Sequence, residues 1–197
     1  MRVVRYILLV LAASQLGGCI FLDWMTSSSE PKPVAASIPS KWVMTGRIGV
    51  IHGEEGWHGK IDWNQNKRNF KAGFFGPFGG KGAEFISKGG KVELRSPSGK
   101  SISGARLNKW QKQNFGGLFP IRALPYWIHG HPYPKMKNAT VKGKVGAAEE
   151  IAQENWVVRY SRWKEFKGRV MPGKIVLIRG DLRMKLILDS YRIVKSK

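Results

Sequence analysis

The alternation of apolar and polar residues constrains the fold of this chain more than any other feature of the sequence. Trp57, Gly59, Ile61 and Trp63 occupy every second position of one segment, with polar residues between them, as on a strand with one face against a core. The same period recurs in short segments separated by turn residues, at 47–52, 70–75, 83–87, 91–95, 156–160, 174–178, 182–188 and 191–194. Short strands at this spacing predict an antiparallel barrel or sandwich.

One region departs from this alternation. Between Ala105 and Gly130 the spacing of apolar residues lengthens; Pro120 suits the start of a helix and Gly130 suits its end. We therefore predict two short helices inserted into a β domain. Placed between two blocks of strands, these helices can cover the open side of a curved sheet.

The N-terminus has the pattern of a lipoprotein leader. A basic start with Arg2 and Arg5 precedes an apolar run that is too short to span a bilayer. Leu16-Gly17-Gly18-Cys19 resembles a lipobox, which predicts a signal peptide at residues 1–18 and an acylated Cys19 as the first residue of the mature protein. Several acyl chains hold a protein at a membrane, whereas one chain binds only marginally. The alternative is a cytosolic protein in which the single cysteine is a buried thiol.

Two further segments follow the leader. Residues 19–40 predict a lipid anchor and a flexible linker, because the segment is rich in Ser, Pro and Ala and has no periodicity. Residues 41–197 carry the strand pattern without an internal repeat, so we expect one domain there. With Cys19 acylated, no thiol is left for a disulfide, and the core alone has to stabilise this domain.

The chain is strongly basic. Its net charge at pH 7 is +21, and removal of the leader leaves +19, because the leader carries two arginines and no acid. Such a charge predicts attraction to polyanions. Residues 159–169 interleave basic and aromatic side chains, which fits a solvated hairpin, a surface for anionic lipids or an acidic partner, or a platform for single-stranded nucleic acid. The predicted lipid anchor argues against the last, so we expect no nucleic-acid partner.

No motif indicates catalysis. Gly99-Lys100-Ser101 ends like a P-loop, but the glycine that should precede it by five positions is absent. His129 and His131 could supply two metal ligands, but the chain has only two other histidines, so we expect surface imidazoles and no metal. We expect no cofactor, no catalytic residue and no enzyme activity.

One loop places aromatic residues among glycines and a proline, between two predicted strands. Phe78 should lie at its tip, because Gly76, Pro77 and Gly79 favour turns and offer no bulk to bury a ring. Either Phe78 folds back under the sheet as a plug, or it faces outward and contacts something other than its own core.

Six motifs occur in the order in which they occur in one protein family. They are Thr45-Gly46-Arg47, Ile61-Asp62-Trp63, Gly76-Pro77-Phe78-Gly79, Leu124-Pro125-Tyr126-Trp127-Ile128-His129-Gly130, Asn155-Trp156-Val157-Val158-Arg159-Tyr160 and Met171-Pro172-Gly173-Lys174-Ile175-Val176-Leu177. With these motifs behind a lipobox, the chain from about Thr45 to its C-terminus resembles the LolB family of outer-membrane lipoprotein receptors.

The resemblance implies a mainly β fold with inserted helices, an unclosed antiparallel β-barrel whose helical lid covers a hydrophobic cavity. It implies a protein that accepts acylated lipoproteins from the periplasmic carrier LolA and inserts them into the outer membrane without ATP. Gly76-Pro77-Phe78-Gly79 matches the family's membrane-insertion loop, so Phe78 is expected to enter the inner leaflet of that membrane. Ile20 after Cys19 is compatible with the outer membrane, and we expect a lipid-anchored monomer that faces the periplasm.

We expect the acyl-chain cavity to be lined by apolar side chains from the dry faces of the predicted strands and helices. These residues are Trp57, Ile61, Trp63, Phe74, Trp127, Ile128, Trp156, Val158 and Leu186. Two alternatives remain for the function: a tethered basic module that binds anionic polymers or lipids, and an enzyme that acts on peptidoglycan or lipid.

Overall fold

A computed structural model describes residues 37–78 and 80–194 of the chain. The predicted signal peptide at 1–18, the anchor Cys19 and the linker as far as residue 36 lie outside the described residues, as does Gly79. The predictions made for them therefore stay predictions.

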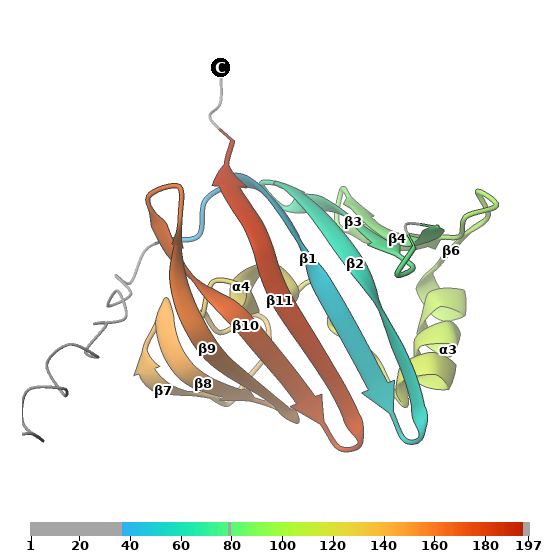
Figure 1. The fold of residues 1–197 in the computed structure, drawn as a ribbon. Coiled ribbons are helices and arrows are strands. Elements are labelled where there is room, and N and C mark those ends of the chain that lie inside the picture. The colour runs from blue at the N-terminus through green and yellow to red at the C-terminus, as the bar shows by residue number, and fades with distance from the viewer. Residues whose placement is uncertain (1–36, 79, 195–197) are drawn as a thin grey trace, which may run out of the picture. The chain divides into compact units, whose positions relative to one another are not determined.

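All strands of the described part join one antiparallel sheet in the order β6-β5-β4-β3-β2-β1-β11-β10-β9-β8-β7 (Figure 1). The strands are β1 (Lys41–His52), β2 (Glu55–Asn66), β3 (Asn69–Phe75), β4 (Lys81–Lys88), β5 (Lys91–Arg95), β6 (Ser101–Ser103), β7 (Ala139–Lys144), β8 (Ala147–Gln153), β9 (Trp156–Phe166), β10 (Arg169–Arg179) and β11 (Leu182–Ile193). The sheet is two meanders joined where the first strand pairs with the last. Because β6 and β7 are its two edges, the sheet is not closed.

The central pairing of β1 with β11 runs from Trp42 opposite Ile193 to His52 opposite Leu182. A bulge interrupts it between Thr45 and Gly46, where a Cβ atom on Gly46 would lie 2.5 Å from a backbone oxygen of β11. Glycine is therefore required at this close approach of two strands.

The alternation seen in the sequence explains most of the strands. In β11, the side chains of Leu182, Met184, Leu186 and Leu188 are buried, and those between them point to the other face. The segments predicted at 182–188 and 191–194 form this single strand. The strands β6, β7 and β8 were not predicted.

Both predicted helices are present. Helix α3 (Gly104–Phe115) ends at Gly116, whose φ of 61° is the left-handed conformation that favours glycine. Helix α4 (Leu124–Trp127) carries Pro125 in its first turn, where no backbone hydrogen bond is lost. In Figure 1, α4 lies behind the central strands and α3 lies beside β6. The predicted mainly β fold with inserted helices is confirmed.

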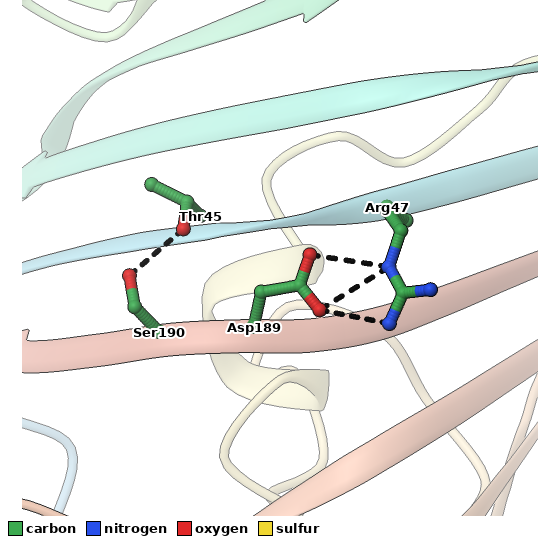
Figure 2. A network of polar contacts seen from close by, with 4 residues as sticks. All are labelled: Thr45, Arg47, Asp189 and Ser190. Carbon is green, nitrogen blue, oxygen red and sulfur yellow. Dashed lines mark hydrogen bonds and ion pairs between the residues drawn. The ribbon is translucent and has the colours of Figure 1, made fainter. Parts of the chain in front are cut away.

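The two faces of the central strands differ in character. The face toward the helices is apolar and includes a stacked pair of indoles, Trp42 and Trp63, 6.0 Å apart. We call the opposite face of β1, β2, β10 and β11 the outer face. Figure 2 shows part of it, where Arg47 and Asp189 form an ion pair at 2.9 Å between β1 and β11. The same figure shows the hydroxyls of Thr45 and Ser190 sharing a hydrogen bond at 2.8 Å.

Candidate functional site

An apolar pocket of about 390 Å³ lies on the helix side of the sheet. We call it the inner pocket, and its volume falls in the range of small-ligand sites. Its apolar lining comes from β1 to β4, from α3 and the segment after it, and from β11: Val50, Trp57, Phe74, Ala83, Phe85, Trp110, Phe115, Phe119 and Met184. His52, Glu55 and Asn114 supply its polar side chains. The arrangement suits a hydrocarbon ligand with a polar end.

The aromatic rings of this lining form a connected series. Phe85 lies edge-on to Phe74, with ring centroids 5.8 Å apart, and also contacts Trp110 at 6.4 Å. Trp110 contacts Phe115 at 5.4 Å, and Phe115 contacts Phe119 at 5.8 Å. Edge-to-face pairs of this kind fix ring orientations, so the wall of the inner pocket is set by packing between α3 and the sheet.

A second, more polar pocket of about 850 Å³ lies between α3, the segment 118–122 and β9. We call it the side pocket. Phe119 lines both pockets and contacts Trp156 of β9 at 5.7 Å. The position of Phe119 therefore affects both spaces at once.

Arg179 of β10 holds the segment that follows α3 against the sheet. Its guanidinium donates hydrogen bonds to the carbonyl oxygens of Phe115 at 2.8 Å and Leu118 at 2.5 Å. It also lies over the ring of Trp156, 4.7 Å from the centroid. Burial lowers the pKa of Arg179, and the nearby Asp181 opposes this change.

The segment after α4 is fixed by buried polar contacts. The side-chain oxygen of Gln153 accepts hydrogen bonds from the Trp127 indole at 3.2 Å and from the backbone amide of Tyr133 at 2.8 Å. Its amide nitrogen donates to the carbonyls of Tyr133 and Met136. One glutamine thus satisfies three backbone groups that would otherwise be costly to bury.

His129 corrects an expectation. It was predicted to be a surface imidazole, but it is only 2% exposed and contacts the Trp42 ring at 4.9 Å. Its Nδ1 lies 2.7 Å from the carbonyl of Pro125, and its Nε2 lies 2.9 Å from the hydroxyl of Tyr191. Burial lowers the pKa of His129 to about 3. Among the described residues, no group of three or more potential metal ligands occurs.

The loop between β3 and β4 presents Phe78 to solvent. Its side chain is fully exposed, at 101%, which excludes the alternative of a plug beneath the sheet. The loop is closed by a hydrogen bond from the amide of Gly76 to the carbonyl of Gly80 at 3.0 Å. The residues that flank the loop, Phe74 and Gly82, both line the inner pocket. An exposed aromatic residue and an apolar pocket are therefore built on the same pair of strands.

The predicted cavity residues fall into two groups. Trp57 and Phe74 line the inner pocket, and Trp156 lines the side pocket; Trp57 is 41% exposed. The other six are buried in the core and line neither pocket: Ile61, Trp63, Trp127, Ile128, Val158 and Leu186. The residues contributed by α3 were missed, because their helical spacing is not visible in a strand alternation.

No helix in the described ranges is long and apolar enough to cross a bilayer.

Comparisons with known proteins agree with this geometry. The family described as "Outer membrane lipoprotein LolB" matches residues 40–191. The chain is 25% identical to the outer-membrane lipoprotein LolB of Nitrosococcus oceani, over 98% of this chain and 100% of that protein. It is 28% identical to the outer-membrane lipoprotein LolB of a Marinomonas species, over 85% of this chain and 88% of that protein.

Two solved structures share the fold. A LolA superfamily protein from Nitrosomonas europaea superposes with a TM-score of 0.57 at 9% identity, covering 83% of this chain and 90% of its own. A DUF1329 family protein from Desulfovibrio piger superposes with a TM-score of 0.53 at 8% identity, covering 81% and 88%. The unclosed antiparallel β-barrel that the family resemblance implies is therefore confirmed, and it is a LolA-like fold.

Proposed function

The chain belongs to the LolB family of outer-membrane lipoproteins, which are non-enzymatic receptors in lipoprotein localisation, and on this premise we propose that it accepts acylated lipoproteins from a LolA-like periplasmic carrier and inserts them into the inner leaflet of the outer membrane without ATP. The family resemblance expected from the sequence is confirmed, and the family's location is the outer membrane. The alternatives of an enzyme and of a polyanion-binding module as the whole function are thereby set aside.

The observation that carries the proposal is the joint position of the inner pocket and Phe78. Phe74 and Gly82 line the pocket and flank the loop on which Phe78 is fully exposed. An acyl chain held against the rings of β3 and β4 therefore lies close to the loop that would enter the membrane. Exposed apolar residues of this kind commonly mark contact sites for a membrane or a partner.

The energetics of transfer need no nucleotide. Burial of apolar surface stabilises a bound acyl chain by roughly 25 cal/mol per Å², but this contribution nearly cancels when the chain moves from one apolar cavity to another. Small differences in fit between the two cavities then set the direction of transfer.

Specific roles follow for the residues singled out in the sequence. We propose that Cys19 carries the acyl anchor and that the loop of Gly76, Pro77, Phe78 and Gly79 enters the leaflet. Trp57 and Phe74 contact the acyl chain in the inner pocket, while the six buried members of the predicted set support its walls. We propose that the protein acts as a monomer.

The test is substitution of Phe78 by glutamate in the lipid-anchored full chain. Phe78→Glu should fold and accept lipoprotein from a loaded carrier, but should not release it into liposomes, because a carboxylate does not enter an apolar leaflet. Val145→Glu is the matched control, since Val145 is 41% exposed in a different turn. Normal release by the Phe78 variant would remove the loop from the mechanism.

A further inference from the structure

The outer face of the sheet carries a groove of about 890 Å³ with a strongly basic lining. We call it the basic groove. Its cationic side chains come from four adjacent strands: Arg47 of β1, Lys60 of β2, Lys174 of β10, and Arg183 and Lys185 of β11. None of the residues that line it is an aspartate or glutamate. The groove is therefore a concentrated positive site rather than part of an evenly mixed surface.

The strand register places these cations in rows across the sheet. Lys174 lies opposite Ile187, which lies opposite Arg47, which lies opposite Lys60. The next row on this face passes through Lys185 and Gly49, about 7 Å along the strands. The register thus places the charges on one face of four adjacent strands.

Few of these charges are neutralised by the protein. Arg47 is paired with Asp189 (Figure 2), whereas Lys60, Lys174, Arg183 and Lys185 form no ion pair within the described ranges. Arg47 and Lys60 are also direct cross-strand neighbours. Like charges in that position destabilise a sheet, and a bound anion would remove this repulsion.

The floor of the groove is apolar and open. It includes Val176, Ile187 and Ile51, and Ile51 is 52% exposed. Gly49 lies between His58 and Lys185 in the register, and a Cβ atom there would have no neighbour closer than 4.0 Å. Small and aliphatic residues among rows of cations suit an amphiphile whose charged group is anionic.

The groove is continuous with the loop that carries Phe78. Pro77, the residue before Phe78, is one of its lining residues, together with Lys60 and Trp57. The loop follows Phe75, which lies opposite Lys60 of the groove. The basic groove and the loop of Phe78 therefore adjoin each other.

We propose that the basic groove binds the phosphate head groups of anionic glycerophospholipids in the leaflet that Phe78 enters, so that the outer face of the sheet lies toward the membrane. This rests on the proposed function, because it assigns a lipid class to the same membrane contact. Cations near a bilayer gain favourable free energy from anionic lipid. The phosphate of such lipids matches the basic side chains, and the first methylenes of their acyl chains match the aliphatic floor.

An acidic carrier protein is the competing occupant, and the position of the groove argues against it. A carrier that hands over an acyl chain has to meet the inner pocket, which lies on the helix side of the sheet. The basic groove meets the inner pocket at the end of the β1–β2 hairpin, where Val50, Gly56 and Trp57 line both spaces. Its cationic residues Arg47, Lys174 and Lys185 project from the opposite face of the sheet, away from the core.

The test measures binding of the full chain to empty vesicles. Cys19→Ala removes the acylation site, so that binding reports on the folded domain. Partition into vesicles of phosphatidylcholine alone is compared with vesicles of equal parts phosphatidylcholine and phosphatidylglycerol. The variant Lys60→Gln/Lys174→Gln/Lys185→Gln is compared with Lys88→Gln/Lys100→Gln/Lys137→Gln, which removes three exposed lysines from outside the groove.

We expect the groove variant to lose affinity for anionic vesicles by on the order of 100-fold, and the control variant to lose much less. Both should bind phosphatidylcholine equally. Equal loss in the two variants would mean that net charge alone drives binding, and would overturn the proposal. Unchanged vesicle binding with impaired uptake from a loaded carrier would assign the groove to the carrier, and would also overturn it. No cargo or carrier is present in the vesicle assay, so its result does not depend on lipoprotein transfer.

Discussion

Arg179 lies over the ring of Trp156 and at the same time donates hydrogen bonds to the carbonyls of Phe115 and Leu118. One side chain of β10 therefore connects β9 to the segment that follows α3. The next residue along that segment, Phe119, lines both the inner pocket and the side pocket. The position of the segment 115–119, which covers part of both pockets, therefore depends on contacts between residues more than 60 positions apart in the sequence.

Arg179→Ala should lower the free energy of unfolding by about 1–3 kcal/mol, because two carbonyls lose a charged donor. It should also speed the exchange of a bound fluorescent fatty acid, since the segment around Phe119 is released. Urea denaturation and stopped-flow fluorescence measure these two effects. Arg192→Ala is the control: Arg192 is exposed on β11, and its loss should change stability by less than about 0.5 kcal/mol. An Arg179 variant that is as stable as the unchanged protein and exchanges the fatty acid at the same rate would contradict this role of Arg179.

Filling the inner pocket should reduce acyl binding without unfolding the protein. Ala83 lines the pocket from β4 and is partly buried, so the ring of Ala83→Phe would occupy space that an acyl chain needs. We expect the affinity for a fluorescent fatty acid to fall by roughly 10-fold or more, equivalent to about 1.4 kcal/mol. Ala139→Phe, on the exposed edge strand β7, should bind normally. Equal binding by the two variants would show that the acyl chain lies elsewhere.

The sequence predicts most of the strands that have one buried face. The exception is β8, whose buried residues Ala148, Ile151 and Gln153 do not alternate regularly. Leu182 to Leu188 alternate because one side of β11 faces the core, and such a pattern is readable without the structure. The strand β7 has no such face, since five of its six residues are exposed. In β6, only three residues pair with β5. Such edge strands are defined by their partners, which sequence periodicity does not show.

The residues that line the inner pocket were only partly predictable, because periodicity does not show what a side chain contacts. Trp57 and Phe74 were identified from alternation, which shows that a residue faces inward but not whether it meets a pocket or another side chain. Trp63 faces inward and packs on Trp42 and Phe70, whereas Trp110 of α3 reaches the inner pocket from across the sheet. Whether an inward-facing residue meets a pocket or the core depends on where α3 docks, about 50 residues away in the sequence. Phe78, by contrast, was identifiable from the sequence because glycines and a proline surround it.

His129 should make the protein less stable in acid. Pro125 supplies only a carbonyl, so Nδ1 of His129 donates to it, and Nε2 of the neutral ring accepts from the hydroxyl of Tyr191. Burial lowers the pKa of His129 from 6.5 to about 3; the hydrogen bond to the Pro125 carbonyl opposes this change, and the nearby Arg169 adds to it.

Between these two pKa values the unfolded chain binds a proton that the folded chain excludes, so stability is present above pH 6.5 and is lost as the pH falls. The loss from this residue at pH 5 should be about 2 kcal/mol. Urea denaturation across this pH range measures it. His129→Gln should be less stable at neutral pH but should lack this part of the slope, whereas His58→Gln, at an exposed position, should retain it. An unchanged slope in the His129 variant would disprove the assignment.

Two glycines of the central strands should respond differently to alanine. A Cβ atom on Gly59 would lie 2.0 Å from the carbonyl oxygen of Phe75 and 2.9 Å from the Trp57 ring. Gly59→Ala should therefore lower the free energy of unfolding by about 1–3 kcal/mol, as overpacking does. Because Phe75 ends β3 directly before the loop of Phe78, this variant should also weaken delivery of lipoprotein to liposomes.

Gly49→Ala is the matched comparison, since the nearest atom to its Cβ is the Trp57 carbonyl oxygen at 4.0 Å. It should change the free energy of unfolding by less than about 0.5 kcal/mol. Urea denaturation of the two variants side by side measures the difference. Equal stabilities would mean that β3 can shift away from β2 at Gly59 without cost, and the close approach of Phe75 to Gly59 would then not fix the position of the loop.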